Sequence, residues 1–493
     1  MDASKKSIAF CSVDFVGHAF PLLNLAEALA KRGHSCTFVV ADYAGKDWKD
    51  RVAKAGCTLQ LLQTGKAKSE MEMNPGGLIP FLYVLKYTSQ SAKDVLARLS
   101  PDLVVADFCT FAAMEAAEEL GIPLVINSPS PYGCIRDFAG FPSPGTTRSL
   151  GGVVWGFNKF KMIELAKLLG VQGLDAFSWY TAKHYPRAVV LVNSFWGIEP
   201  AQPTPSTIVM TGALIPPAGD LTAKLQKEEP TLCAWLGKAG AKPVVFISTG
   251  SLAELHPWQV KAFFEGVKRA GLRAVWSLRK HLHVHLPNAE DEDFWISPWL
   301  PQAAILQDQA VKLVVYHCGW GGTMEVLQAG KPMVLCPFFA DQPDIGRTLV
   351  AAGVGELIGP APALSYNIEN PWREGQFTAD SVAEVLKRVA SDPKYTQAAE
   401  RMGRLSGTTL GANGAAALVE QCALNGTSHL VAPEARRSTG SNPFRGAIGV
   451  CLVGAAAGLC AVSHAAAAAV GLGGCLAGAR AAARTYRPAA VAP

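Results

Sequence analysis

The stretch HCGWGGTMEVLQAGKPMVLCPFFADQ, from His317 to Gln342, concentrates residue types that bind anions and sugars. A histidine can donate to a phosphate, and consecutive glycines let a backbone approach a ligand closely. A helix beginning there would offer unpaired N–H groups to an anion. A glutamate suits a ribose diol, and the final Asp-Gln pair can bind sugar hydroxyls. The candidate ligand-binding residues are His317, Trp320, Gly321, Gly322, Glu325, Asp341 and Gln342.

Two motifs upstream add to this predicted donor site. WLPQ supplies Trp299, a flat apolar face for a base, and Gln302, whose amide can pair with a base edge. STGS places Ser251 in a glycine turn that follows an apolar run, where it could reach a diphosphate. Together the residues predict a site for a nucleotide that carries a sugar.

A candidate general base lies near the N-terminus, in DFVGHAFPLLNLAEAL. His18 follows an apolar run, and an imidazole can abstract a proton near neutral pH. Such a base needs a carboxylate to hold its tautomer. Asp107 ends the run LVVAD and is the favoured partner, and Glu115 is the alternative. Glu118 and Glu119 follow Glu115, as they would on a solvated helix face.

Apolar runs that alternate with segments of helical period must position these residues. SIAFCSV, PLLNLAEALAKRG and CTFVVAD predict a strand, a helix from Pro21 to just before Gly33, and a second strand. A second alternating series begins with KPVVFISTG. Repeated strand-helix-strand units indicate parallel sheets, which bind ligands at the carboxyl ends of their strands. The sequence therefore predicts an α/β protein with two doubly wound halves.

A segment rich in Pro, Gly and charge separates the two series. We expect an N-terminal domain over 1–213 that carries the candidate base, a linker over 214–228 and a domain over 229–426 that carries the candidate nucleotide site, whose last helices pack back on the first domain. A tail follows over 427–493. Within it, 446–479 carries no charge and is rich in Ala and Gly, which makes it a candidate membrane segment or an Ala/Gly-biased appendage.

The composition excludes several classes of function. The net charge of +5 resides in the tail, with six arginines against one glutamate, so the body lacks the basic surface that nucleic-acid binding requires. Twelve cysteines occur without a C-x-x-C pair, which suggests neither a zinc site nor a redox motif. The N-terminus shows no signal-peptide pattern, so we expect a cytoplasmic body, with 446–479 as its only candidate anchor.

The run from Trp299 to Gln342 resembles the nucleotide-sugar signature of the UDP-glycosyltransferases, which have the two-domain GT-B fold. The W-x-P-Q start, the H-C-G-W turn, the Glu, the G-x-P and the final D-Q occur in the same order and spacing. The resemblance implies uracil on Trp299, ribose on Glu325, and donor sugar on Asp341 and Gln342. It also implies diphosphate on His317 and the Gly321-Gly322 turn, and no metal or other cofactor.

The G-H-x-x-P pattern around His18 likewise resembles that family, in which this histidine deprotonates an acceptor hydroxyl. Animal members use an Asp at the place of Asp107, whereas plant members place theirs near Glu115. Plant members usually have Asn-Ser where this chain has Gly321-Gly322, so backbone groups must contact the diphosphate here. AGKP and PFFADQP look somewhat like the sterol glucosyltransferase branch.

We therefore predict an inverting, metal-independent transfer of a hexose, glucose first, from a UDP-sugar to a hydroxyl of a lipophilic molecule such as a sterol or phenolic. A UDP-sugar epimerase and a non-catalytic, membrane-associated UDP-sugar-binding protein are the alternatives. A positioned base argues against the binding protein. His281, His283 and His285 would share one face if extended, and Asp291-Glu292-Asp293 contains a D-x-D pattern, but neither has other metal-ligand spacing.

Overall fold

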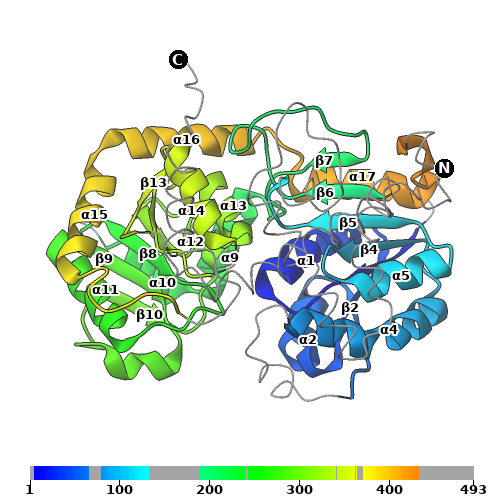
Figure 1. The fold of residues 1–493 in the computed structure, drawn as a ribbon, viewed down its shortest axis with the longest axis horizontal. Helices are drawn as coiled ribbons and strands as arrows, with labels where there is room; N and C mark the ends of the chain where they lie inside the picture. The colour runs from blue at the N-terminus through cyan, green and yellow to red at the C-terminus, as the bar shows by residue number, and fades with distance from the viewer. Residues whose placement is uncertain are drawn as a thin grey trace, which may run out of the picture. The chain divides into compact units, whose positions relative to one another are not determined.

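The computed structural model describes residues 5–65, 79–132, 188–238, 242–339, 341–360, 362 and 370–431. The described strands form two sheets, in which every pairing between strands is parallel. Both belong to one compact unit, residues 1–432. Figure 1 shows the sheets side by side with helices packed around each. The predicted α/β class with two doubly wound halves is confirmed.

The sheet of the first lobe has the strand order β3-β2-β1-β4-β5-β6-β7. Its strands are short and almost wholly apolar, as expected for parallel strands buried on both faces. They are β1 (Ser7–Cys11), β2 (Ser35–Ala41), β3 (Thr58–Leu62), β4 (Leu103–Asp107), β5 (Leu124–Ser128), β6 (Val189–Val192) and β7 (Ile208–Met210). The helices of this lobe are α1 (Val16–Lys31), α2 (Gly45–Lys54), α4 (Ile79–Leu99) and α5 (Phe111–Glu119).

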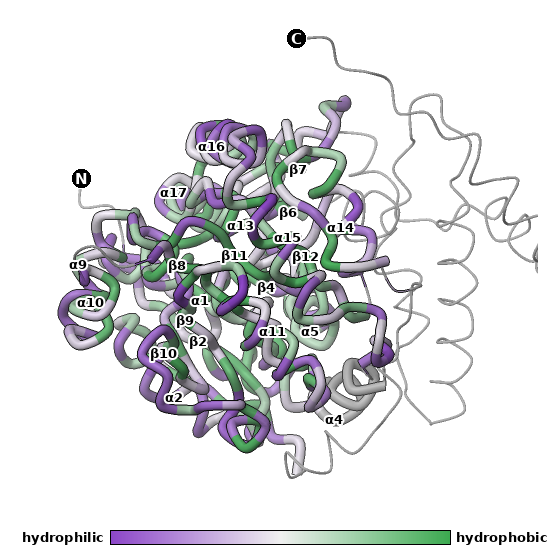
Figure 2. The backbone as a smooth tube through the Cα atoms, turned by 90° about the vertical axis from the view of Figure 1, so that its left-hand side faces the viewer, coloured by the Kyte–Doolittle hydropathy of each residue, from purple (hydrophilic) through white to green (hydrophobic). Residues whose placement is uncertain are grey.

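The sheet of the second lobe has the order β10-β9-β8-β11-β12-β13. Its central strands β8 and β11 lie at the hydrophobic end of the scale in Figure 2. The strands are β8 (Val244–Ser248), β9 (Arg273–Ser277), β10 (Phe294–Ser297), β11 (Val311–Tyr316), β12 (Met333–Leu335) and β13 (Gly355–Leu357). The helices are α9 (Ala218–Glu228), α10 (Pro230–Leu236), α11 (Pro257–Ala270), α12 (Gln302–Ile305), α13 (Trp320–Gln328), α14 (Gln342–Ala351), α15 (Ala379–Ser391) and α16 (Pro393–Ser406).

Two segments outside the sheets, the predicted linker and the last long helix, bury side chains in the cores of the lobes. The predicted linker 214–228 contains α9, whose Leu221 and Leu225 are buried in the core of the second lobe. Helix α17 (Gly411–Asn425) returns to the first lobe and packs on α1. Its small residues Ala415 and Ala416 are fully buried there, so the last long helix of the described chain is part of the core of the first lobe.

The helix that carries His18 begins earlier than the sequence predicted. It starts at Val16, and Pro21 lies inside it rather than in its first turn. Proline lacks an N–H and cannot bond to the carbonyl of Gly17 four residues before it, but only that one helical bond is lost. His18 therefore lies in the first turn of α1, directly beyond the carboxyl end of β1.

None of the described helices is both long enough and apolar enough to cross a membrane. The predicted candidate segment 446–479 lies outside the described residues.

Candidate active site

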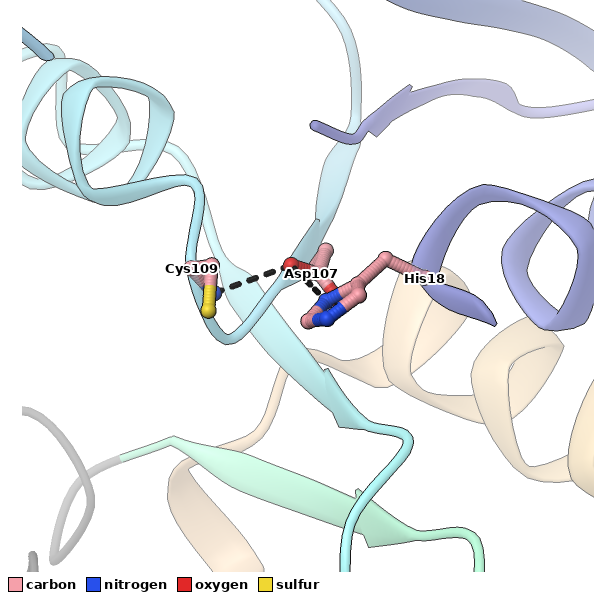
Figure 3. Close-up of side chains that lie close together, drawn as sticks. All are labelled: His18, Asp107 and Cys109. Atoms are coloured by element: carbon pink, nitrogen blue, oxygen red, sulfur yellow. Dashed lines mark hydrogen bonds and ion pairs between the residues drawn. The ribbon is translucent and has the colours of Figure 1, made fainter. Parts of the chain in front are cut away.

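His18 and Asp107 meet at the carboxyl edge of the first sheet. Asp107 is the last residue of β4, which lies next to β1, and it is fully buried. Its carboxylate oxygens lie 3.0 and 3.1 Å from Nδ1 of His18. Figure 3 shows the imidazole and the carboxylate facing one another. Neighbouring parallel strands end at the same edge, so the topology itself brings this pair together.

Further contacts fix both members of the pair. The backbone N–H of Cys109 donates to Asp107 over 2.9 Å, which holds the carboxylate from the side away from the histidine (Figure 3). The ring of Phe108 stacks on His18, with 5.5 Å between the ring centroids and 7° between the planes. Sequence reasoning missed Phe108, although it directly follows the predicted carboxylate. The His18 side chain keeps 21% of its surface exposed, so the predicted base is accessible.

The electrostatic surroundings favour a histidine that can hold a proton. Burial lowers the pKa of His18, but attraction and hydrogen bonding by Asp107, together with the charges of Asp341 and Asp14, outweigh it and raise the pKa above 6.5. Asp341 belongs to the second lobe, so a predicted sugar-binding carboxylate acts directly on the predicted base. Glu115, the alternative partner, lies in the middle of α5 and is half-buried.

The second lobe offers a tight turn between β11 and α13. His317 follows β11 directly, Cys318 adopts a positive φ of 66°, and Gly319 is the N-cap of α13. A left-handed backbone is unusual for a residue with a side chain and marks a turn that the surrounding structure enforces. No sequence signal identified Cys318. The helix begins at Trp320, so Thr323 lies in its first turn and is not its cap.

Two glycines, Gly250 and Gly319, lie close to the imidazole of His317. A Cβ at Gly250 would lie 2.5 Å from Nε2 of His317, and a Cβ at Gly319 would also collide with that atom. Side chains at either position would push the imidazole away. Burial lowers the pKa of His317 to about 4, with a smaller opposing effect of a hydrogen bond to the backbone of Ser248. His317 is therefore neutral at physiological pH and could donate one N–H.

The glycine pair at the start of α13 is required by its neighbours. A Cβ on Gly321 would lie 3.3 Å from the carbonyl oxygen of Gly17 in the first lobe, next to His18. A Cβ on Gly322 would collide with the hydroxyl of Tyr316 and lie 2.8 Å from Nε2 of Gln302. The tyrosine thus fills the space that a larger residue at 322 would need. The first turn of α13 can present only backbone groups here.

Glu325 and Gln302 interact within the predicted nucleoside site. Nε2 of Gln302 donates to Oε2 of Glu325 over 2.8 Å. Burial raises the pKa of Glu325 to about 7, and the hydrogen bond from Gln302 lowers it by less. Near neutral pH this carboxyl group is therefore partly protonated, and could donate to or accept from a diol.

The two predicted tryptophans lie in opposite environments. Trp320 is 4% exposed in the core of the second lobe, and its indole N–H donates to the backbone oxygen of Asn193 over 2.9 Å. It ties the two lobes together, a position unlike that of a donor-binding surface residue. Trp299 is 52% exposed. Phe20 stacks on it at 5.9 Å, and the guanidinium carbon of Arg51 lies 4.5 Å from its ring centroid.

The remaining predicted donor residues lie at the edges of the second sheet. Asp341 is exposed and is the N-cap residue of α14. Gln342 is buried. Its Oε1 accepts a hydrogen bond from the backbone N–H of Phe338 over 2.9 Å, so only its amide N–H groups remain to donate to a sugar. Ser251 is exposed in the turn after β8.

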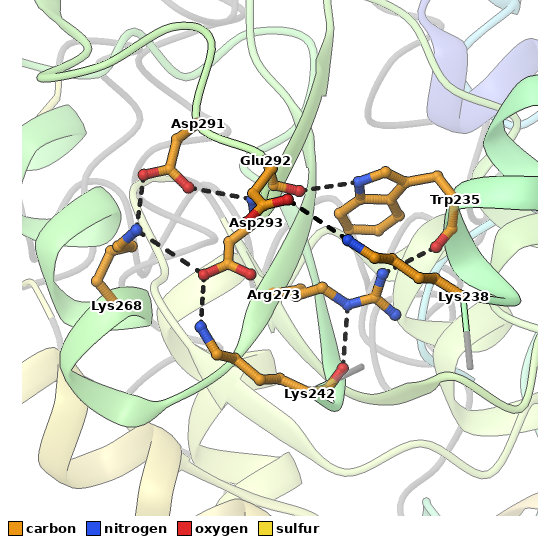
Figure 4. A network of polar contacts seen from close by, with 8 residues as sticks. All are labelled: Trp235, Lys238, Lys242, Lys268, Arg273, Asp291, Glu292 and Asp293. Atoms are coloured by element: carbon orange, nitrogen blue, oxygen red, sulfur yellow. Dashed lines mark hydrogen bonds and ion pairs between the residues drawn. The ribbon is translucent and has the colours of Figure 1, made fainter. Parts of the chain in front are cut away.

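The histidine-rich and acidic motifs outside this site have structural partners. His281, His283 and His285 lie in a short 3₁₀-helix (Lys280–His285), not in an extended strand. His283 contacts the carbonyl oxygen of Leu278 at 2.9 Å. In the acidic motif each carboxylate meets a lysine, as Figure 4 shows. The pairs are Lys268–Asp291 at 2.6 Å, Lys242–Asp293 at 2.6 Å and Lys238–Glu292 at 3.4 Å.

A cavity of the first lobe adjoins the His18–Asp107 pair. It is small, and both apolar and polar side chains line it. Its lining residues are Ser12, Val13, Asp14, Ala41, Tyr43, Leu62, Thr88, Cys109, Thr110, Phe111 and Ala112.

Comparisons with known proteins agree with this organisation. A family model described as UDP-glucoronosyl and UDP-glucosyl transferase matches residues 187–406. UDP-glycosyltransferase 74C1 of Arabidopsis thaliana is 24% identical over 385 residues, which cover 69% of this chain and 82% of that protein. Flavonol 3-O-glucosyltransferase of Arabidopsis thaliana is 34% identical over 213 residues, which cover 41% of this chain and 44% of that protein.

Solved structures show the same fold at lower identity. The glycosyltransferase Os79 of O. sativa, in complex with U2F and trichothecene, superposes with a TM-score of 0.66 at 16% identity, covering 84% of this chain and 100% of that one. The calicheamicin glycosyltransferase CalG4 superposes with a TM-score of 0.56 at 20% identity, covering 85% and 98%. These solved structures show that the chain shares the two-lobed fold of glycosyltransferases. The family model over residues 187–406 and the relatives show that the chain is similar to the UDP-glycosyltransferases and support a glycosyltransferase enzyme.

Proposed function

We propose that the protein transfers a hexose, in the first instance glucose, from a UDP-sugar to a hydroxyl group of a lipophilic small molecule, with inversion at the anomeric carbon. The observation that carries this proposal is the contact between Nδ1 of His18 and the buried carboxylate of Asp107, at 3.0 Å.

In the proposed reaction, Asp107 accepts a hydrogen bond from Nδ1–H and so fixes the tautomer of His18. Nε2 is then the ring nitrogen that removes the proton from the acceptor hydroxyl. The acceptor oxygen forms a bond to the anomeric carbon as the bond from that carbon to the UDP oxygen breaks. The imidazolium that forms is stabilised by Asp107, in keeping with the raised pKa of His18.

On the donor side, the start of α13 and the neutral His317 would bear the charge of the diphosphate, without a metal. Helix N-terminal N–H groups bind phosphate well, and here two of them belong to Gly321 and Gly322, which have no side chains in the way. Trp299 would stack on the uracil, Glu325 and Gln302 would contact the nucleoside, and Ser251 lies in a turn that could reach the diphosphate. The closeness of Asp341 to His18 supports a sugar held directly beside the base.

The names of the relatives narrow the proposed acceptor class. Named relatives act on flavonols and, in the case of anthocyanidin 3-O-galactosyltransferase 3GT6 of Rhododendron delavayi, on anthocyanidins; that enzyme is 26% identical over 62% of this chain and 69% of its own length. A phenolic hydroxyl has the lowest pKa among neutral alcohols of this kind and suits a histidine base. A polyphenol is therefore our first acceptor, ahead of a sterol.

The test is direct. The purified full chain is incubated with UDP-glucose, UDP-galactose and UDP-glucuronate, each with flavonol, sterol and fatty-alcohol acceptors, and products are followed by mass spectrometry. NMR of the product then gives the anomeric configuration. We expect a β-linked hexoside of a phenolic acceptor. Retention of configuration would contradict the mechanism, and failure to consume any UDP-sugar would contradict the function.

A further inference from the structure

A third potential ligand atom lies beside the His18–Asp107 pair. Cys109 follows two residues after Asp107, at the turn between β4 and α5, and is half-buried. A ring nitrogen of His18, a carboxylate oxygen of Asp107 and Sγ of Cys109 all lie within 4.8 Å of one another. Figure 3 shows Asp107 between Cys109, which lies on the turn after β4, and His18, which lies on α1.

This set of one nitrogen, one oxygen and one sulfur atom matches the ligands that Zn²⁺ prefers. Bond lengths to zinc are about 2.0 to 2.3 Å, so ligand atoms around one ion lie about 3 to 4 Å apart. The upper limit of 4.8 Å on the observed spacing lies about 1 Å above that range. Three protein ligands would leave a fourth position for water, as in zinc sites that are not closed.

The charge around the three residues also favours a cation. Asp107 is fully buried, and Asp14 and Asp341 add their negative charges at His18. A divalent cation would compensate the negative charge of these carboxylates. Zn²⁺ binds a thiolate well, whereas Mg²⁺ prefers oxygen ligands and binds it poorly.

We propose that His18, Asp107 and Cys109 form an inhibitory site for Zn²⁺ or a similarly thiophilic divalent cation. Binding releases the thiol proton to solvent and uses one nitrogen lone pair of the imidazole. If Nε2 binds the ion, the base is blocked. If Nδ1 binds it, the ring proton moves to Nε2, which then has no lone pair for the acceptor proton. Either way, transfer stops, while the reaction itself still needs no metal.

The inhibition rests on the proposed role of His18, whereas the binding of the ion does not, so the two are tested separately. Binding is measured on the metal-free full chain with Co²⁺, which reports a thiolate ligand through a sulfur-to-cobalt charge-transfer band, and with Zn²⁺ by calorimetry. We expect one equivalent to bind with that band. Its absence would overturn the proposed site even in a protein that transfers sugar normally.

Inhibition is measured as the transfer rate against Zn²⁺ concentration, relative to the same protein in EDTA. We expect reversible loss of transfer with Zn²⁺ and none with Mg²⁺ at equal concentration. Cys109→Ser should raise the inhibitory Zn²⁺ concentration by at least about tenfold, since it removes the thiolate ligand. Cys233→Ser, at a half-buried cysteine of the second lobe, is the matched control and should keep the sensitivity of the wild type.

Cys109→Ala serves as a second variant, and circular dichroism verifies the fold of each. Equal Zn²⁺ sensitivity of the wild type and both Cys109 variants would contradict the proposal. If the wild type binds Co²⁺ with the charge-transfer band but transfers no sugar under any condition, the metal site stands and the proposed function fails.

Discussion

His18 and His317 lie at corresponding places in the two lobes, yet their surroundings give them opposite chemistry. Each follows the carboxyl end of a parallel strand and precedes or begins a helix. His18 faces a buried carboxylate, and its pKa lies above 6.5. His317 is enclosed between Gly250 and Gly319, away from such a partner, and burial lowers its pKa to about 4. The same side chain is thus prepared as a proton acceptor in one lobe and as a neutral hydrogen-bond donor in the other.

The difference shows that the strand topology places each histidine at the carboxyl edge of its sheet. The residues that follow the neighbouring strand then set the pKa of that histidine. In the first lobe that neighbour, β4, ends in Asp107. In the second lobe β8 is followed by a glycine turn, which offers backbone and space instead of charge.

The largest expected effect comes from removing the proposed base. His18→Ala should lower kcat for transfer by about 10²- to 10⁴-fold, the usual contribution of general-base catalysis. UDP binding, measured by calorimetry, should change little, because the diphosphate is assigned to the second lobe. A variant that retains wild-type transfer would show that the two histidines do not differ in the way proposed.

Removing the carboxylate should come next. Asp107→Asn takes away the negative charge that raises the pKa of His18, while burial continues to lower it. The base must be neutral to act, so activity rises with pH through the pKa of His18. The acid limb of the profile of kcat/KM against pH should therefore shift to lower pH in the variant, and kcat should fall by about 10²-fold or more because the tautomer is no longer fixed.

Glu115→Gln is the control for this experiment, because Glu115 is the alternative partner. It should leave the acid limb where it is. If instead Glu115→Gln moves the limb and Asp107→Asn does not, the pairing seen between His18 and Asp107 is not the one used in the reaction.

A smaller effect is expected at the donor histidine. His317→Ala should raise KM for the UDP-sugar by about 10- to 100-fold, as for the loss of one hydrogen bond to a charged group, with a lesser effect on kcat. Steady-state kinetics at saturating acceptor measures it. His283→Ala, at another half-buried histidine of the second lobe, should leave KM unchanged.

For the last variant we expect no change in the pH profile. His317→Gln should leave the acid limb of the pH profile unshifted, because a group with a pKa of about 4 is already neutral throughout the working range. A displaced limb in this variant would mean that both histidines titrate during the reaction, and the contrast between the lobes would be lost.

Sequence reasoning could place the site because its signals are local. Strand ends, glycine turns and the spacing of His317, Glu325 and Asp341 follow from the order of the chain. The neighbours of these residues do not. Trp320 reads as a ligand-facing aromatic until the structure shows its indole bonded to Asn193 of the other lobe. Arg51 carries no sequence signal of its own, and contacts Trp299 only because the lobes come together.

The start of one helix was missed for a similar reason. Pro21 is a local signal for a helix start. Buried contacts outweigh this signal, since α1 extends back to Val16 and its Ala19 and Leu22 are fully buried. Local propensity is a weak guide where tertiary packing supplies more free energy.

The hydroxyl of Tyr316 has a consequence for protein engineering. A plant-like Asn-Ser pair could be introduced at Gly321-Gly322 to add side-chain contacts to the diphosphate. The hydroxyl group already fills the volume of a Cβ at 322, and the carbonyl of Gly17 crowds a Cβ at 321. The Asn-Ser pair of a plant relative therefore does not fit at Gly321-Gly322 without further changes. Grafting it requires a side chain smaller than phenylalanine at 316, because Cζ of Tyr316 also lies only 2.6 Å from a Cβ at 322, and the effects of the two changes will be strongly non-additive.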